Sequence, residues 1–127
     1  MNSKVIKRMM DFDLLVKIPG RKNALGETSY KELQMKCYLK ESLKSIYDSL
    51  GKEVTSSVQL YVTGEDGLSI PNNALLSIGH YEDVYDETTG EVIDVKFLPM
   101  YENRTIIKRE IYYRPHRVAD SGIFYLP

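Results

Sequence analysis

The feature that most constrains the fold is a strict two-residue alternation over residues 54–63. Successive side chains of a β-strand point to opposite faces, so residues of one parity line one face. The run is rich in β-branched and aromatic residues, which favour strands, and the turn residues Gly51 and Gly64 bound it. The two parities are Val54, Ser56, Val58, Leu60, Val62 and Thr55, Ser57, Gln59, Tyr61, Thr63. The pattern predicts a strand with one apolar face.

Similar short segments recur along the chain. Residues 12–18 and 33–39 alternate in the same way, although a helix remains an alternative for 33–39. Residues 80–98 indicate a hairpin whose turn is "DETTG", and "LLSIG", "RTIIKREIYY" and "IFYLP" indicate further strands. We therefore predict an all-β domain, a small antiparallel β-barrel of seven to eight short strands.

Residues 41–53 are ambiguous, because their apolar side chains recur at helical spacing before Gly51. The spacing suggests a short helix or a structured loop, but the sequence leaves loop, helix and strand open for residues 40–53. The whole chain is expected to hold at most one short helix. The 127 residues suit a single domain over 1–127. Terminal arms are an expectation for residues 1–10 and 114–127.

Composition excludes several classes of protein. The single cysteine, Cys37, cannot form an internal disulfide, and no Cys or His cluster has zinc spacing. Lys7 and Arg8 interrupt the apolar residues at the start, so no secretory signal is expected, and we expect folding in a reducing cytoplasm. No apolar run approaches the roughly 18 to 20 residues of a membrane helix.

Charge is unevenly distributed along a chain whose net charge is −1. Residues 1–40 hold nine Lys or Arg against four Asp or Glu, a net +5, whereas residues 64–102 hold nine acids against one Lys, a net −8. Proteins that grip nucleic acid usually carry a basic excess, which is missing here. The polarity fits either head-to-tail association or a solvated surface.

The chain offers no combination of residues that argues for an enzyme. His80 and His116 lie in different segments without a nucleophile motif nearby, and Cys37 lies on the apolar parity of its strand. The acids of residues 82–91 flank a hairpin turn without calcium-loop spacing. We therefore expect no catalytic residue, no metal and no cofactor.

One arrangement of segments is more specific than any single motif. An N-terminal strand, the loop "LGETSY" and the strand "YKELQMKCYLKES" precede "DSLGKEVTSSVQLYV", a Pro/Gly loop, "LLSIG" and a hairpin. Over Leu25 to Ile78 this order resembles the head-closure, or stopper, proteins of long-tailed bacteriophages, which are also described as minor capsid or head–tail connector proteins. The hairpin 80–98 and the tail after Tyr113 are longer than in that family's pattern.

The resemblance implies a β-barrel in a ring of sixfold or twelvefold symmetry at the phage neck. Its partners would be other copies, a portal or adaptor protein on the head side and a tail or tail-completion protein on the other. The ring would complete the head by closing the channel through which genomic DNA passes without specific binding. The chain would be a virion protein at the head–tail interface, assembled in the bacterial cytoplasm, without a membrane partner. The implied channel-closing loop contains Lys40, Leu43, Lys44, Ile46, Tyr47, Leu50 and Lys52.

Two contacts between copies are expected in such a ring. The basic strands of residues 14–40 would meet an acidic hairpin on the next copy, formed by Glu82, Asp83, Asp86, Glu87 and Glu91. The terminal arms would add to a neighbour's sheet, with Phe124, Tyr125 and Leu126 in contact. Frayed ends are the alternative for both arms.

Two other functions remain open at this level. A single-stranded nucleic-acid-binding barrel of the OB type would need basic and aromatic residues on one face, and Lys108, Arg109, Tyr112 and Tyr113 are the one tight cluster. A tail-completion protein of the same neck would have similar length and composition.

Overall fold

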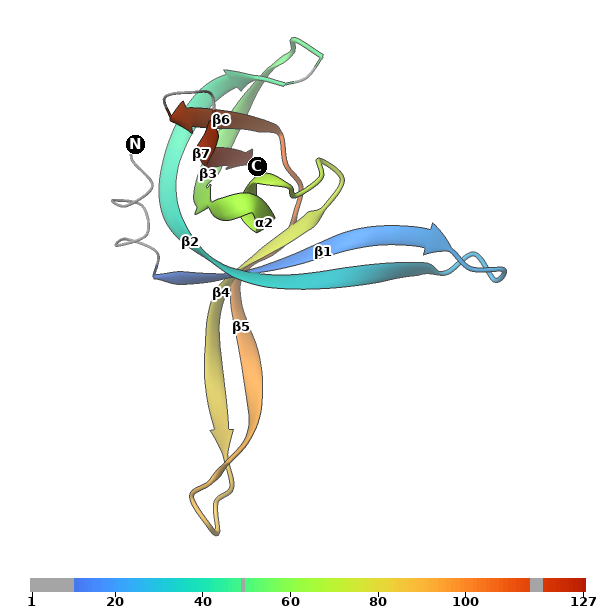
Figure 1. Ribbon diagram of the computed structural model, residues 1–127, viewed down its shortest axis with the longest axis vertical. Coiled ribbons are helices and arrows are strands. Elements are labelled where there is room, and N and C mark those ends of the chain that lie inside the picture. Colours follow the sequence, from blue (N-terminus) through green and yellow to red (C-terminus); the bar gives the residue numbers. More distant parts are fainter. Residues whose placement is uncertain (1–10, 49, 115–117) are drawn as a thin grey trace.

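The protein is described by a computed structural model that covers residues 11–48, 50–114 and 118–127. Over these ranges seven strands form one antiparallel sheet in the order β5-β4-β1-β2-β3-β7-β6 (Figure 1). The predicted all-β class is confirmed. The strands are β1 Phe12–Lys22, β2 Thr28–Tyr47, β3 Glu53–Thr63, β4 Leu75–Tyr85, β5 Val92–Arg104, β6 Lys108–Arg114 and β7 Val118–Leu126, with a short helix, α2, at Gly64–Leu68.

The predicted closed barrel is not shown, because the sheet is open between its edge strands β5 and β6. Closure would require these two strands to pair. Instead β5 follows β4 out of the body as a hairpin, in register from His80↔Leu98 to Val84↔Asp94, with a bulge at Ile93 before Tyr85↔Val92. The segments 75–79 and 81–85, expected as separate strands, are the single strand β4.

The core lies on one face of the curled sheet and brings together strands from both of its halves. The parity predicted for β3 is confirmed at Val58, Leu60 and Val62, which are buried. They pack in one cluster with Leu14, Val16, Cys37, Leu39, Ile70, Ala74, Leu76, Ile78, Phe124 and Leu126. A second, smaller cluster covers the opposite face, where Tyr61, Ile123 and Tyr125 pack with Tyr38 and Ile46.

Residues 41–47 are strand, one of the three conformations that the sequence left open, and not the short helix or loop that their spacing suggested. β2 continues to Tyr47 and pairs with β3 through a register shift between Glu41 and Lys44. At this bulge Ser42 Oγ donates to Gln59 Oε1 (2.6 Å), and Gln59 Nε2 donates to the Ser42 carbonyl (3.0 Å). The buried amide thus holds the extra residue in place, which keeps the segment in the sheet.

The helix lies instead in the segment expected to be a loop. α2 packs on β3 and β7 at the end of the core, and Gly67 lies so close to Val62 that an added Cβ would be 3.0 Å from Val62 Cβ. Leu68 joins the core cluster and Ile70 is buried just beyond it. Tertiary burial therefore holds a turn of helix that "GEDGL" does not favour on its own.

The C-terminal segment is part of the sheet, so the expected arm over 114–127 is wrong for the residues described. β7 pairs with β3 from Val58↔Leu126 to Thr63↔Ser121, and with β6 on its other side. Phe124 and Leu126 are fully buried and Tyr125 is nearly so. These side chains contact the protein's own core because two strands flank β7. The other predicted arm, residues 1–10, lies outside the described residues.

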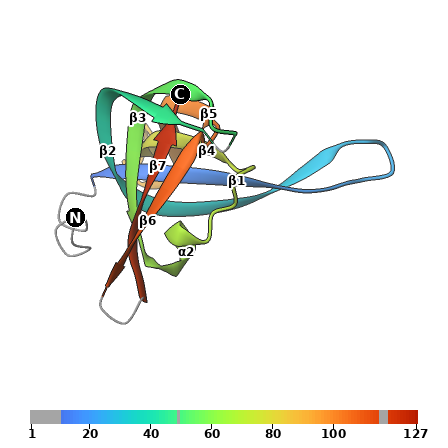
Figure 2. The ribbon, with the colours of Figure 1, turned by 90° about the horizontal axis from the view of Figure 1, so that it is seen from above.

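Two long hairpins leave the body in different directions. The β1–β2 hairpin extends to the right in Figure 1, and the β4–β5 hairpin extends downwards. Seen from above in Figure 2, the β1–β2 hairpin still projects far beyond the rest of the sheet. The molecule therefore presents two separate extensions from one core.

Candidate assembly surfaces

The acidic hairpin, defined here as His80–Met100, carries all five acids predicted as an inter-subunit surface. Its turn is rigid, because Asp86 Oδ1 accepts the Thr88 N–H (2.7 Å) and the Asp86 carbonyl accepts the Gly90 N–H (2.8 Å). Six acids and Lys96 give the hairpin a net charge of −5. Glu82 lies opposite Lys96 on the neighbouring strand, so a single cross-strand pair offsets part of that charge. The predicted residues are Glu82, Asp83, Asp86, Glu87 and Glu91.

The same hairpin exposes an unusual amount of apolar surface, which the sequence prediction missed. Seven of the fourteen large apolar side chains that are exposed among the described residues lie on it: Val84, Tyr85, Val92, Ile93, Val95, Leu98 and Met100. A signal was present in "VIDVKFLPM", where both parities are largely apolar. A two-stranded hairpin with two apolar faces is marginal by itself, which makes this one a candidate contact surface.

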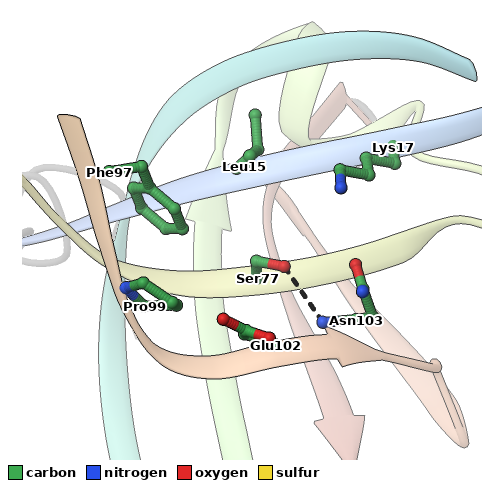
Figure 3. A pocket seen from close by; sticks show the side chains of 7 residues that line it. All are labelled: Leu15, Lys17, Ser77, Phe97, Pro99, Glu102 and Asn103. Atoms are coloured by element: carbon green, nitrogen blue, oxygen red, sulfur yellow. Dashed lines mark hydrogen bonds between the residues drawn. The ribbon is translucent and has the colours of Figure 1, made fainter. Parts of the chain in front are cut away.

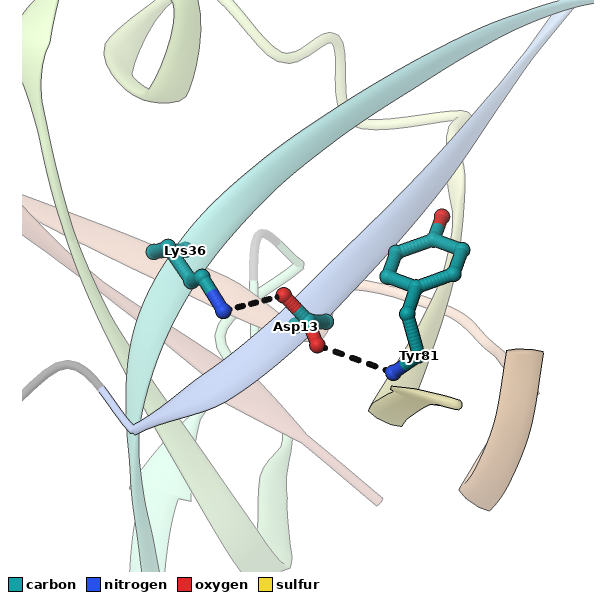
Figure 4. Close-up of polar contacts among 3 residues, drawn as sticks. All are labelled: Asp13, Lys36 and Tyr81. Carbon is teal, nitrogen blue, oxygen red and sulfur yellow. Dashed lines mark hydrogen bonds and ion pairs between the residues drawn. The ribbon is translucent and has the colours of Figure 1, made fainter. Parts of the chain in front are cut away.

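A polar contact fixes the hairpin at its base (Figure 4). Asp13 on β1 forms an ion pair with Lys36 Nζ on β2 (2.6 Å) and accepts the backbone N–H of Tyr81 on β4 (3.0 Å). Burial raises the pKa of Asp13, but the hydrogen bonds from Lys36 and Tyr81 and the charge of Lys36 outweigh it and lower the pKa overall. An ionised carboxylate thus ties three strands together where the hairpin begins.

The backbones of β4 and β5 also approach closely at that base. A Cβ added to Gly79 would lie 2.0 Å from the Leu98 carbonyl oxygen, so only glycine fits there. Beside this crossing is a small hollow, shown in Figure 3, lined by Leu15, Lys17, Ser77, Phe97, Pro99, Glu102 and Asn103. There the Asn103 N–H donates to Ser77 Oγ (3.0 Å), so two of the polar groups that line the hollow join β5 to β4.

The basic hairpin, defined here as residues 17–31, is the other extension. Lys17, Arg21, Lys22 and Lys31 against Glu27 give it a net charge of +3. Its turn is also ordered by one side chain, because Asn23 Oδ1 accepts the N–H groups of Leu25 and Glu27 (both 2.9 Å). The basic excess predicted over residues 14–40 therefore includes a projecting, preformed surface.

The residues predicted to close a channel lie on a third hairpin, between β2 and β3. Leu43 and Tyr47 are exposed on β2, Leu50 is exposed in the turn, and Ile46 packs against the Tyr61 cluster. Asp48 Oδ1 orders the turn by accepting the N–H groups of Leu50 and Lys52 (both 2.9 Å). The segment thus has fixed contacts within the chain. The predicted set is Lys40, Leu43, Lys44, Ile46, Tyr47, Leu50 and Lys52.

The candidate nucleic-acid cluster does not form one surface. On β6 the side chains of Lys108 and Tyr112 share a parity with Glu110, whose carboxylate accepts from Tyr112 Oη (3.2 Å) and lies 3.7 Å from Lys108 Nζ. Arg109 has the other parity: its guanidinium lies 5.0 Å from the Phe124 ring centroid and donates to the Ile70 carbonyl. Desolvation lowers the pKa of Arg109, which is committed to the core.

The candidate nucleophile and histidines are not brought together. Cys37 is buried as predicted, and burial raises the pKa of its thiol to about 12. His80 lies against the Phe12 ring, with centroids 4.9 Å apart, and His116 falls outside the described residues. No group of three or more His, Cys, Asp or Glu side chains in the described part of the chain is placed to hold a metal. Within those same ranges, no helix has the length and apolar character to cross a membrane.

Comparison of the chain with protein-family models, with curated proteins and with solved structures finds no match.

Proposed function

We propose that this chain is a structural subunit of the bacteriophage neck, forming a ring that completes the head, closes the DNA channel and offers the tail its attachment surface. The proposal rests on the resemblance of residues 25–78 to head-closure proteins. The observation that carries it is the pair of oppositely charged hairpins, at −5 and +3, extending from one body in different directions (Figure 1).

Such a pair suits a head-to-tail ring. A heterologous contact joins two different surfaces of identical subunits and repeats around an axis until the ring closes. The acidic hairpin of one copy would meet the basic hairpin of the next, and charge complementarity would fix the register. In this arrangement the β2–β3 hairpin, with Leu43, Tyr47 and Leu50 exposed, is the element we assign to the channel.

The copy number of the protein in purified particles tests the proposal. Quantitative mass spectrometry, scaled to the major capsid protein, is expected to give a small fixed number that matches one ring at a single vertex. Presence of the protein in infected cells together with its absence from particles would contradict the neck role.

Charge reversal tests the contact between copies. Replacing Glu82, Asp83 and Glu91 with Lys, or Arg21, Lys22 and Lys31 with Glu, is expected to prevent incorporation into particles without unfolding the chain. Co-expression of the two variants should restore incorporation, because each then offers a surface complementary to the other in an alternating ring. Normal incorporation of either variant alone would refute this contact.

A further inference from the structure

The strand β5 forms an open edge of the sheet among the described residues, and the segment between two of its bulges is regular and mostly apolar. Natural edge strands are usually short, bulged, or interrupted by charges and proline, because unpaired backbone groups recruit other strands. β5 spans thirteen residues and is bulged at Ile93 and at Met100, next to Pro99. The five residues 94–98 between these bulges pair regularly with β4 and contain just two charged residues, Asp94 and Lys96. Ile93, just before this segment, is 63% exposed.

One backbone group on this edge shows where another strand would bind. The N–H of Val95 donates to Oδ1 of Asp94, the preceding residue on the same strand, at 2.8 Å. In a sheet, the partner of an outward N–H is the carbonyl of a neighbouring strand. The carboxylate of Asp94 therefore accepts the Val95 N–H in the place of the carbonyl that a further strand would supply.

The sequence of this edge is complementary to itself when read in the opposite direction. With two copies antiparallel about a twofold axis at Val95, Asp94 of each lies opposite Lys96 of the other. Ile93, the bulged residue, would lie opposite Phe97, so an apolar side chain meets an apolar one at each end of the paired segment. Directly opposed cross-strand pairs of opposite charge, or of apolar groups, are the pairs that stabilise a sheet.

The remaining charges do not oppose this arrangement. Antiparallel strands send the two hairpin turns in opposite directions, so the acids at Asp86, Glu87 and Glu91 lie at the two ends, away from the axis. On one face of the joined sheet, Glu82 already lies opposite Lys96 within each copy, and Lys96 would in turn lie opposite Asp94 of the other copy. Charges of opposite sign therefore alternate along this row of residues.

We propose that two copies of this chain pair antiparallel through β5, about a twofold axis at Val95. The contact is isologous and closes with two copies, so it differs from the head-to-tail contact of the ring. The purified chain would form this dimer by itself, so the dimer proposal does not depend on a role in the phage neck.

Site-specific cross-linking tests the axis. In a pair of opposed residues the Cα atoms lie about 4.5 to 5.5 Å apart, within the range of a disulfide, so Val95→Cys should link two copies under mild oxidation. Ile93→Cys is the matched control, because two copies of residue 93 would lie about 13 Å apart. The buried Cys37 does not compete for the oxidant. Failure of Val95→Cys to link, or equal linking by Ile93→Cys, would overturn the proposal.

Charge exchange tests the register by analytical ultracentrifugation of the full chain. Asp94→Lys or Lys96→Asp places two like-charge pairs at the junction and is expected to raise the dimer dissociation constant tenfold or more. The double variant, Asp94→Lys with Lys96→Asp, should restore the wild-type constant. Glu82→Lys is the control, because it disturbs the intramolecular pair with Lys96 and leaves the β5–β5 register unchanged.

Circular dichroism of each variant separates loss of pairing from loss of fold. A folded single variant that dimerises as tightly as the wild type would overturn the register. A wild-type chain that stays monomeric at the highest concentration reached would overturn the dimer itself.

Discussion

Replacing Phe124 with Ala should remove a large part of the stability of this fold. Phe124 is fully buried in the core cluster, pairs with Leu60 on β3 and with Arg109 on β6, and lies under the Arg109 guanidinium. Truncation of a buried Phe to Ala costs about 3 to 5 kcal/mol, through lost transfer energy and the cavity that remains. Since a domain is stable by about 5 to 15 kcal/mol, the variant loses at least a fifth of its free energy of unfolding.

Urea unfolding followed by far-UV circular dichroism is the suitable assay, because the chain has no Trp to report by fluorescence. For a domain of this size the loss corresponds to a fall in Tm of roughly 10 to 20 °C. Leu50→Ala is the control: Leu50 is 91% exposed in a turn, and its truncation should change stability by about 0.5 kcal/mol or less. Phe124→Leu provides a milder variant if the alanine variant does not fold.

A loss of less than about 1 kcal/mol for Phe124→Ala would refute the reasoning. β7 would then contribute little to the core, and the interpretation of residues 114–127 as an arm that docks on a neighbour would return.

Three further predictions concern single sites. Asp13→Asn should lower the free energy of unfolding by about 1 to 3 kcal/mol at neutral pH. Because folding lowers the pKa of Asp13, the difference in unfolding free energy between the variant and the wild type should shrink as the pH falls through about 4 and below, as measured by urea titrations. Gly79→Ala should destabilise the protein by about 1 to 3 kcal/mol, measured by thermal melting, because its Cβ collides with the Leu98 carbonyl; an unchanged melt would contradict the close crossing. Cys37 should resist thiol reagents at pH 8 until urea is added, and rapid labelling of the native protein would refute its burial.

The sequence predicts those parts of the fold that depend on a single strand or on two strands adjacent in the chain. Val58, Leu60 and Val62 alternate with more polar neighbours, and their burial needs no information from elsewhere in the chain. The hairpin around Gly90 is predicted for the same reason, because its turn residues and both strands are adjacent in sequence. The assignment of residues 80–98 to a hairpin was therefore correct, as was the all-β class.

The ambiguity of residues 41–53 in the sequence has a specific physical origin. Cys37 and Leu39 are buried before the bulge, whereas Ile46, of the opposite parity, is the residue that packs on the Tyr61 cluster after it. Leu43 and Tyr47, of the other parity, are exposed, so the apolar side chains of this segment lie on both faces of the strand and their spacing imitates a helix. What keeps the segment in the sheet is the register shift held by the buried amide of Gln59, a partner on another strand that no local pattern reveals.

For the two candidate assembly surfaces, the sequence predicts the charge but not the shape. Counting Asp, Glu, Lys and Arg located the acidic and basic segments, but the projection of both hairpins depends on tertiary contacts such as that between Asp13 and Tyr81. The apolar edge at Val92–Leu98 was hidden because an apolar strand in sequence looks the same whether it is central or at an edge. Its position became clear from the strand order alone.

The position of β7 between β3 and β6 has a consequence for how the chain folds. Val58 pairs with Leu126, so β3 has no partner on that side until synthesis has passed through β4, β5 and β6. Contacts between such distant residues are slow to form, which predicts folding in milliseconds to seconds and little cotranslational completion of the core. During that interval the edge of β3 is bare, with Val58, Leu60 and Val62 along it, and the nascent chain is at its most prone to aggregate.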